Sequence, residues 1–268
     1  MTEPTDPVGK HSNAPLTRSL VDTTAAPASA PVSGGRDDLD ARDDDADEGD
    51  GVVAFDEDAI VDPTASLHDR MPKVLPTLLP APPSWPAVFG RTAPLECELG
   101  FGRPHFLMER AVEVPDHDVV GIEWKGRWPK MVWEKQKKGL YPNLRAIHGN
   151  AWLLFGGLFP PSSLSLLVLN FPDPWWKAKH QKRRIVSDTF ARLMASRLQP
   201  GGRILIQTDV ATLLEEYLAR LEAQPELENT AGRFRLAPKK PLSASSHREK
   251  RCRADGIPIF RAVLERVR

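Results

Sequence analysis

The chain has 268 residues, enough for one large domain or two small ones, and its 36 basic and 36 acidic residues balance. The two signs are segregated, however: residues 1–70 carry 17 acids against 5 bases, a net charge of −12, and residues 71–268 carry 19 acids against 31 bases, a net charge of +12. Two cysteines are too few for a disulfide framework or a zinc ribbon, and no apolar run approaches the roughly 20 residues of a membrane span. These features predict a cytoplasmic protein, not bound to a membrane, whose basic part binds a polyanion.

The first 94 residues are predicted to lie outside the main domain. Residues 1–70 are rich in Pro, Ala, Ser, Thr and Asp, a composition that buries too little apolar surface to offset the entropy of ordering. We expect a disordered acidic tail there, and a second hypothesis is that its acids compete with nucleic acid for the basic part. Residues 71–94 hold seven prolines between scattered apolar residues, which predicts a Pro-rich lead-in without a regular element. Residues 95–268 form the predicted main domain.

Within that domain, short apolar runs alternate with segments of helical spacing. Five strands are predicted in chain order, over residues 95–99, 119–124, 144–148, 164–170 and 203–208, and two more candidates cover 234–236 and 257–264. Helices are predicted over 103–114, 126–138, 188–198 and 211–224, with a short helical piece after residue 150. This alternation is typical of an α/β fold with a doubly wound, mostly parallel sheet. In such sheets ligands bind beyond the carboxyl ends of the strands.

A polar residue stands at the carboxyl end of each of the first five strands: Glu98, Glu123, Asn150, Asp173 and Asp209. The first strand also leads into a Gly-Phe-Gly turn at residues 100–102, where glycine lets the backbone approach a ligand closely. Taken alone, the second acid is either a ribose ligand or a solvated charge, and the asparagine is either an adenine ligand or a helix N-cap. Polar residues at all five ends favour a site for a nucleoside cofactor.

The stretch from Asn170 to Trp176 (Asn-Phe-Pro-Asp-Pro-Trp-Trp) has an unusual composition, and a basic segment follows it at 177–184. Two prolines fix the backbone on either side of Asp173, so the turn holds a carboxylate between aromatic rings. Carboxylate, flat rings and clustered cations suit a nucleobase that is attached to a phosphate backbone. Taken alone, the stretch is equally consistent with a Pro-rich loop packed for stability.

Six motifs resemble, in order and spacing, those of the bacterial tRNA (guanine-N7)-methyltransferases. They are Glu-Leu-Gly-Phe-Gly (98–102), Gly-Ile-Glu (121–123), Gly-Asn-Ala (149–151), Asn-Phe-Pro-Asp-Pro-Trp (170–175), the basic segment, and Pro-Gly-Gly with the later Thr-Asp (200–209). The resemblance runs from about Pro94 to the C-terminus. It implies a Rossmann-like class I methyltransferase fold with a seven-stranded sheet, S-adenosylmethionine as the cofactor, and tRNA as the partner, methylated to 7-methylguanosine at position 46 of its variable loop.

The same resemblance implies roles for individual residues. The cofactor site would contain Glu98, Gly100, Glu123, Asn150 and Asp173, and Asp173 would also be the catalytic residue. The target nucleotide would contact Lys177, Asp209, Ser246 and Glu249. No metal is implied, and the chain is expected to be a monomer or a homodimer. Ser246-x-x-Glu249 stands where the family has Thr-x-x-Glu, and its spacing is also that of a helix capping box.

Two departures from the family pattern bear on the cofactor. Pro104 replaces the usual third glycine and removes an N–H, although proline is tolerated in a first helical turn. Asn150 replaces the usual aspartate and keeps a carbonyl acceptor without the charge. These departures support one alternative, a catalytically inert RNA-binding module. A second alternative is a class I methyltransferase that acts on a small molecule or protein, and a nicotinamide oxidoreductase is disfavoured because His105 stands where the dinucleotide fingerprint needs glycine.

The chemistry expected of the site follows from the substrate atom. Guanine N7 has a lone pair and no proton, so methyl transfer to it needs no general base, and catalysis should consist of alignment and charge stabilisation. Asp173 and Asp209 would orient the guanine edge and offset the positive charge of the product, and Phe171 or Trp175 would stack on the base. Cations predicted to hold RNA phosphates are Lys177, Lys179, Lys182, Arg183, Arg184, Arg248, Lys250, Arg251 and Arg253.

Overall fold

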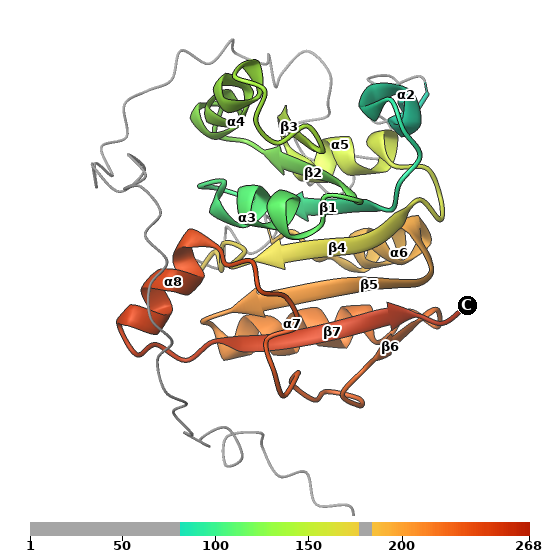
Figure 1. Cartoon of the computed structure of the whole chain (residues 1–268). Helices are drawn as coiled ribbons and strands as arrows, with labels where there is room; N and C mark the ends of the chain where they lie inside the picture. Colours follow the sequence, from blue (N-terminus) through green and yellow to red (C-terminus); the bar gives the residue numbers. More distant parts are fainter. Residues whose placement is uncertain (1–80, 177–183) are drawn as a thin grey trace, which may run out of the picture. The chain divides into compact units, whose positions relative to one another are not determined.

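A seven-stranded sheet organises the computed structural model, which describes residues 81–176 and 184–268 (Figure 1). The predicted acidic tail, the first ten residues of the lead-in and the basic residues 177–183 lie outside the described residues. Along the sheet the strand order is β3-β2-β1-β4-β5-β7-β6. The strands are β1 (Leu95–Leu99), β2 (Asp118–Glu123), β3 (Leu144–His148), β4 (Leu164–Asn170), β5 (Leu198–Thr208), β6 (Leu227–Asn229) and β7 (Phe260–Arg266).

The first five strands are parallel, and β7 is antiparallel to both β5 and β6. The chain moves outward from β1 to β3, returns to β4 beside β1, and then moves outward again through β5. This reversal of strand order between β1 and β4 is where ligands bind in doubly wound sheets. The predicted α/β fold with a mostly parallel sheet is confirmed.

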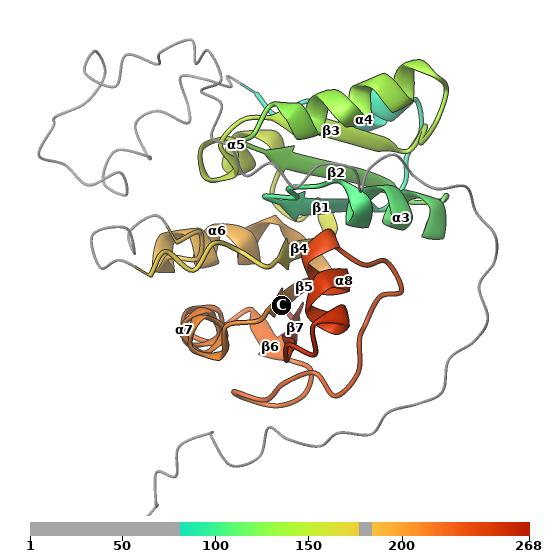
Figure 2. The same cartoon turned by 90° about the vertical axis from the view of Figure 1, so that its left-hand side faces the viewer.

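Both faces of the sheet are covered, which explains why the strands are continuous apolar runs. In β4, Leu167 and Leu169 pack into the main core with residues of α5, α6 and α7, whereas Leu166 and Val168 pack on the opposite face with Phe106 of α3. Successive strand residues point to opposite faces, so a strand with two apolar faces needs two layers of helices. Figure 2 shows α5, α6 and α7 on one face and α3 and α8 on the other.

Helices connect the strands in chain order. They are α2 (Trp85–Phe89), α3 (His105–Glu113), α4 (Arg127–Lys137), α5 (Ala151–Leu158), α6 (Asp188–Arg197), α7 (Ala211–Leu221) and α8 (His247–Ala254). The N-cap of α6 is Ser187, whose Oγ accepts a hydrogen bond from the Phe190 N–H (3.2 Å). In α7, buried residues recur every three to four positions, so one face of the helix lies on the core.

Four sequence predictions differ from the structure. Residues 234–236 form no strand, because the edge strand β6 lies earlier, at Leu227–Asn229. The lead-in contains a short helix, α2, whose N-cap Ser84 and early proline suit a helix start. Strand β5 begins before Pro200-Gly201-Gly202 and runs through it, and its pairing with β4 shifts register there. Helix α8 lies between the two last strand candidates, where no helix is predicted.

Candidate functional site

The glycine turn after β1 is bound to the end of β2. Gly100 and Gly102 have φ angles of +68° and +54°, which glycine adopts without the strain of a side chain. The Gly102 N–H donates to Glu123 Oε2 (2.8 Å), and the Lys125 N–H donates to Glu123 Oε1 (2.7 Å). Each oxygen of this buried carboxylate therefore accepts a hydrogen bond from a backbone N–H, and each keeps a further lone pair for a ligand. Helix α3 begins directly after Pro104, so the turn keeps its form with proline there.

Glu98 is the most deeply buried of the acids at the strand ends, with 1% of its surface exposed. Its Oε1 accepts a hydrogen bond from Asn170 Nδ2 (2.6 Å), and its Oε2 has no hydrogen-bond partner among the described residues. Burial raises the pKa of Glu98 to about 8, the Asn170 hydrogen bond opposes the rise, and the nearby Glu123 adds to it. A buried acid with one unmet oxygen suits a cationic or hydrogen-donating ligand.

Asn150 forms the N-cap of α5 at the end of β3. Its Oδ1 accepts a hydrogen bond from the Trp152 N–H (2.9 Å), and the preceding Gly149 N–H donates to the Glu123 carbonyl (2.9 Å). The capping interpretation of this residue is therefore correct, and the backbone bond keeps Asn150 beside the end of β2. One lone pair of its side-chain oxygen is left for a ligand.

The turn that carries Asp173 is held under backbone strain. Phe171 and Trp175, which flank Pro-Asp-Pro, have φ angles of +49° and +45°, a conformation that costs an aromatic residue about 1–2 kcal/mol. The Phe171 N–H donates to the Gln207 carbonyl of β5 (2.7 Å), and Arg184 Nε donates to the Pro174 carbonyl (2.9 Å). Asp173 itself is exposed. Strain of this kind is typical of functional turns.

Arg184 acts on this turn and is not a free surface cation. Besides its bond to Pro174 it forms an ion pair with Glu216 of α7, and 15% of its side chain is exposed. The other cations that the sequence predicted for phosphate binding on α8 are also largely paired within the chain. Arg248 pairs with Asp209, Lys250 with Glu109 (2.8 Å) and Arg253 with Glu249 (2.6 Å).

The predicted substrate contacts lie around α8, in different environments. Asp209 is partly buried and bound to Arg248. Ser246 is the N-cap of α8, and its Oγ accepts a hydrogen bond from the Glu249 N–H (3.1 Å). The serine therefore has the capping role that the Ser-x-x-Glu spacing predicts. Glu249 is fully buried and bound by cations from three segments, Lys240, Arg253 and Arg261. Lys177 lies outside the described residues.

Two residues of this region were not predicted as functional: the Asn170 side chain and Gln207. Both are buried amides near the carboxyl ends of β4 and β5. The signal that marks them in the sequence is a carboxamide in the last two positions of a strand, directly after a run of at least three apolar residues. A third unpredicted contact joins Arg103 of the glycine turn to His247 of α8 (2.7 Å), and the Arg103 guanidinium lies 5.7 Å from the Trp128 ring centre.

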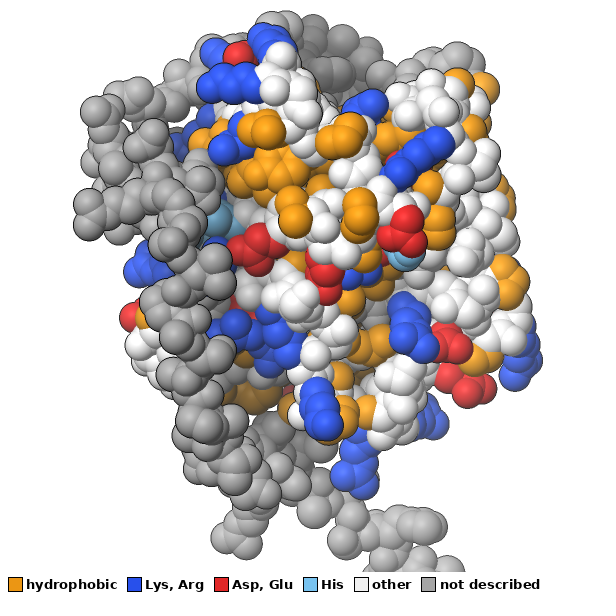
Figure 3. All heavy atoms as spheres, viewed as in Figure 1, with side chains coloured by type: hydrophobic (Ala, Val, Ile, Leu, Met, Phe, Trp, Pro, Cys, Tyr) orange, Lys and Arg blue, Asp and Glu red, His pale blue; other side chains and the backbone are white. Residues whose placement is uncertain are grey.

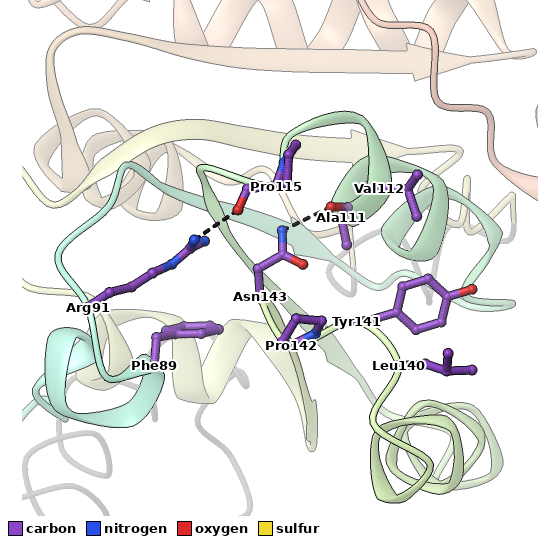
Figure 4. Close-up of a pocket in the computed structure, with 9 residues that line it drawn as sticks. All are labelled: Phe89, Arg91, Ala111, Val112, Pro115, Leu140, Tyr141, Pro142 and Asn143. Atoms are coloured by element: carbon purple, nitrogen blue, oxygen red, sulfur yellow. Dashed lines mark hydrogen bonds between the residues drawn. The ribbon is translucent and has the colours of Figure 1, made fainter.

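A hollow of about 490 Å³ lies away from these residues (Figure 4). Its lining includes Pro115 and Asn143, which precede the starts of β2 and β3, whereas the site acids lie at or beyond the carboxyl ends of the strands. Arg91 closes one side by donating to the Pro115 carbonyl (2.8 Å). Figure 3 shows apolar side chains gathered over α3 and α4. Val112 of α3 and Leu140, which follows α4, are exposed and line the hollow. The hollow is not part of the carboxylate-lined edge.

Among residues 81–176 and 184–268, no group of three or more His, Cys, Asp or Glu side chains is placed to hold a metal ion. No helix in the same ranges has the length and apolar character needed to cross a membrane.

The strand order, the antiparallel β7 and the carboxylates at the carboxyl edge define a class I methyltransferase fold. A family model described as "Putative methyltransferase" matches residues 92–262. The tRNA (guanine-N(7)-)-methyltransferase of Myxococcus xanthus (strain DK1622) is 36% identical over 183 residues, which are 68% of this chain and 88% of that protein. The protein of the same description from Anaeromyxobacter dehalogenans (strain 2CP-C) is 36% identical over 200 residues, 74% and 97% of the two chains. This chain belongs to the tRNA (guanine-N7)-methyltransferase family.

Among solved structures, the 16S rRNA methyltransferase KamB matches with a TM-score of 0.49 and 16% identity, covering 67% of this chain and 91% of that one. The family predicted from the six motifs is confirmed by the curated relatives. The roles of individual residues stay predictions.

Proposed function

We propose that this chain transfers a methyl group from S-adenosylmethionine to N7 of guanine at position 46 of tRNA. The observation that carries the proposal is the arrangement of one edge of the sheet in a member of this family. Buried Glu98 and Glu123 lie at the ends of adjacent strands, and the strained turn with exposed Asp173 follows β4, the strand on the other side of β1. Ligands of doubly wound sheets bind beyond such an edge, where the strand order reverses.

The residues present fit the cofactor. Bound S-adenosylmethionine supplies an electrophilic methyl group and carries positive charge. Glu98, with its unmet buried oxygen, would hold the charged amino acid end, and Glu123 would accept the ribose hydroxyls with its remaining lone pairs. Gly100 would let the backbone approach the cofactor, and Asn150 would accept from the adenine amino group while it caps α5.

Guanine would be held on the Asp173 side of the edge. Because N7 has no proton, Asp173 would serve as the catalytic residue by orienting the N1–H and amino edge and by offsetting the positive charge that develops on the ring. Asp209 would share this task, and its bond to Arg248 would have to rearrange or be shared when the base arrives. Ser246 and Glu249 would hold α8 in its place beside the base. Lys177 would contact the nucleotide directly.

The partner is proposed to be tRNA, in the cytoplasm, with the chain acting as a monomer or a homodimer. Phosphates would be held by the basic residues 177–183 and by α8, where Arg251 and Arg253 are exposed. To bind phosphates, the paired cations of α8 would have to give up their protein partners. Each would therefore contribute less to RNA affinity than an unpaired cation does.

The test is incubation with unmodified tRNA and labelled S-adenosylmethionine, followed by mapping of 7-methylguanosine by borohydride–aniline cleavage. We expect label in the tRNA and cleavage at position 46. Label without cleavage at guanine, or no transfer to tRNA despite cofactor binding, would contradict the proposal and favour one of the other classes of methyltransferase.

The role of Asp173 gives the first mutational prediction. Asp173→Asn keeps the size of the side chain and removes the charge, so we expect the single-turnover rate to fall about 100-fold with a smaller change in cofactor affinity. Asp116→Asn is the matched control, since Asp116 is also an exposed aspartate but precedes β2 at the opposite end of the strand. A near-normal single-turnover rate for Asp173→Asn would exclude this role.

A further inference from the structure

A row of hydrogen-bonded polar side chains crosses the sheet from β1 to α8. Asn170 Nδ2 on β4 donates to Glu98 Oε1 (2.6 Å), and Gln207 Nε2 on β5 donates to Asn170 Oδ1. The same Gln207 nitrogen donates to Glu249 Oε2 on α8 (3.2 Å), and Arg261 Nε on β7 donates to Gln207 Oε1 (2.9 Å). The row therefore joins the predicted cofactor carboxyl to the buried acid of α8.

The strand register places these side chains together. Asn170 pairs with Gln207 across β4 and β5, and Gln207 pairs with Arg261 across β5 and β7. Directly paired residues project to the same face of a sheet. Two positions before the amides, Val168 and Leu205 pack on the face that carries α3 and α8 (Figure 2), and a period of two puts the amides on that face as well.

Each member of the row is held by its neighbours in one orientation. The Asn170 amide donates to Glu98 and accepts from Gln207. A flip of this amide would turn its oxygen toward Glu98 Oε1 and its NH2 group toward the NH2 group of Gln207. Gln207 is the junction, because its NH2 group serves Asn170 and Glu249 while its oxygen accepts from Arg261. The exposed fractions are 8% for Asn170, 1% for Gln207 and 0% for Glu249, so loss of one partner would leave a buried polar group unpaired, which is costly.

At its far end the row is bound to charges that fix α8. Glu249 Oε1 lies 2.6 Å from Arg253, 3.0 Å from Arg261 and 3.4 Å from Lys240. Its other oxygen accepts only the Gln207 bond among the described contacts. A buried cluster of this kind is weak evidence for stability, since apolar residues of the same volume serve as well or better. Its arrangement is better explained by the positions that it fixes.

We propose that Gln207 is a positioning residue that holds Glu98 and α8 in register, so that the cofactor and the target nucleotide are presented to each other. The inference rests on the proposed function for the identity of the two ligands. Gln207 touches neither ligand in this scheme. It acts through Asn170 on the orientation of the Glu98 carboxyl and through Glu249 on the placement of α8.

The test compares Gln207→Leu with Gln224→Leu. Gln224, which follows α7, is also a buried glutamine (8% exposed), and its Nε2 donates to the Arg220 carbonyl (3.0 Å), remote from the row. We expect Gln207→Leu to raise both the Kd for S-adenosylhomocysteine, measured by calorimetry, and the KM for tRNA by about tenfold each. The control should leave both within about twofold for a similar loss of stability. Equal behaviour of the two variants would overturn the proposal.

A double-mutant cycle separates positioning from loss of packing. Asn170→Leu and Glu249→Gln alter residues that are joined only through Gln207 among the described contacts. We expect their effects on the Kd for S-adenosylhomocysteine to be non-additive in the native background and additive in the Gln207→Leu background. Additive effects in both backgrounds would overturn the proposal.

If Gln207→Leu does not fold, the native chain gives the answer. The side-chain amide signal of Gln207, followed by NMR, should shift when S-adenosylhomocysteine is added, and the Gln224 signal should not. An unmoved Gln207 signal would reject the row as a connection to the cofactor. Absence of S-adenosylhomocysteine binding or of methyl transfer by the native chain would instead reject the proposed function, so the two failures are distinguishable.

Discussion

Glu98 keeps a proton under conditions in which most glutamates have lost it. The pKa of this residue rises from 4.5 to about 8, chiefly through burial, so the folded chain binds the proton more tightly than the unfolded chain does. The stabilisation from this proton is complete below pH 4.5 and is lost as the pH rises through about 8. The ligand-free protein should therefore be less stable on the alkaline side of neutrality.

Glu98→Gln tests this linkage. Glutamine has the shape of the protonated acid and can still accept from Asn170, so we expect the variant to lose less stability between pH 6 and pH 9. The difference should be roughly 3 kcal/mol in the free energy of unfolding, from denaturant titrations at the two pH values. Glu134→Gln is the control, because Glu134 is an exposed acid on α4. Parallel pH profiles for the native chain and Glu98→Gln would contradict the shift.

At the scale of single residues, the sequence predicts where a site residue lies in the fold better than it predicts the burial and the partners of its side chain. The strand-end acids are predictable as one group because the carboxyl ends of parallel strands meet at one edge of the sheet, which follows from topology alone. The burial of Glu249 was not predictable, because Ser-x-x-Glu is also typical of exposed helix starts. The pairing of Arg248 with Asp209 joins residues 39 positions apart, and no local pattern encodes such a contact.

Helix α8 is the element whose stability depends most on its ends. It has eight residues, of which only Glu249 and Cys252 are buried, and a helix of this length is marginal without caps and tertiary contacts. Its N-cap hydrogen bond comes from Ser246. Loss of this cap should therefore loosen the helix locally before it affects the sheet.

Ser246→Ala should cost about 1 kcal/mol of helix stability. We expect faster hydrogen exchange of the α8 amides and a raised KM for tRNA, with little change in cofactor affinity. Ser187→Ala removes the equivalent cap from α6 and should destabilise that helix without affecting the KM for tRNA. If the two variants have the same KM, α8 has no part in tRNA binding.

At the scale of elements, two wrong predictions have identifiable structural causes. Phe234 and Leu236 look like a strand because they are apolar and alternate, but Phe234 is held in a turn at φ +54° by backbone donation to Glu222. Pro200-Gly201-Gly202 separates the predicted helix 188–198 from the predicted strand 203–208, whereas β5 passes through it with Gly201 at φ +76° and a shift of register. Short-range propensity cannot distinguish a bulge from a break.

Over the whole molecule, the segregation of charge should control binding to tRNA. Residues 71–268 have a net charge of +12, and residues 1–70 have a net charge of −12. If the acidic segment competes with RNA, removal of residues 1–70 should tighten tRNA binding at low salt, and the difference should shrink as salt rises. The measurement is a set of tRNA Kd values across a salt series.

The control for this prediction keeps the chain length. In a full-length variant, the nine acids between Asp37 and Asp50 are replaced by their amides, which removes charge without removing bulk. We expect it to resemble the truncated chain. Equal affinity of all three proteins for tRNA at low salt would show that the acidic segment does not compete.

The two cysteines give the molecule a built-in pair of reporters. Cys97 lies in β1 and Cys252 in α8, and both are buried. Burial raises the pKa of each thiol, so neither reacts readily with an alkylating reagent in the folded chain. Cys252 becomes accessible when α8 detaches from the sheet, whereas Cys97 requires the sheet itself to open. We expect Cys252 to be alkylated first and bound tRNA to slow its alkylation alone. The ratio of the two alkylation rates then measures how often α8 detaches while the sheet stays folded. The measurement uses the native chain and needs no attached probe.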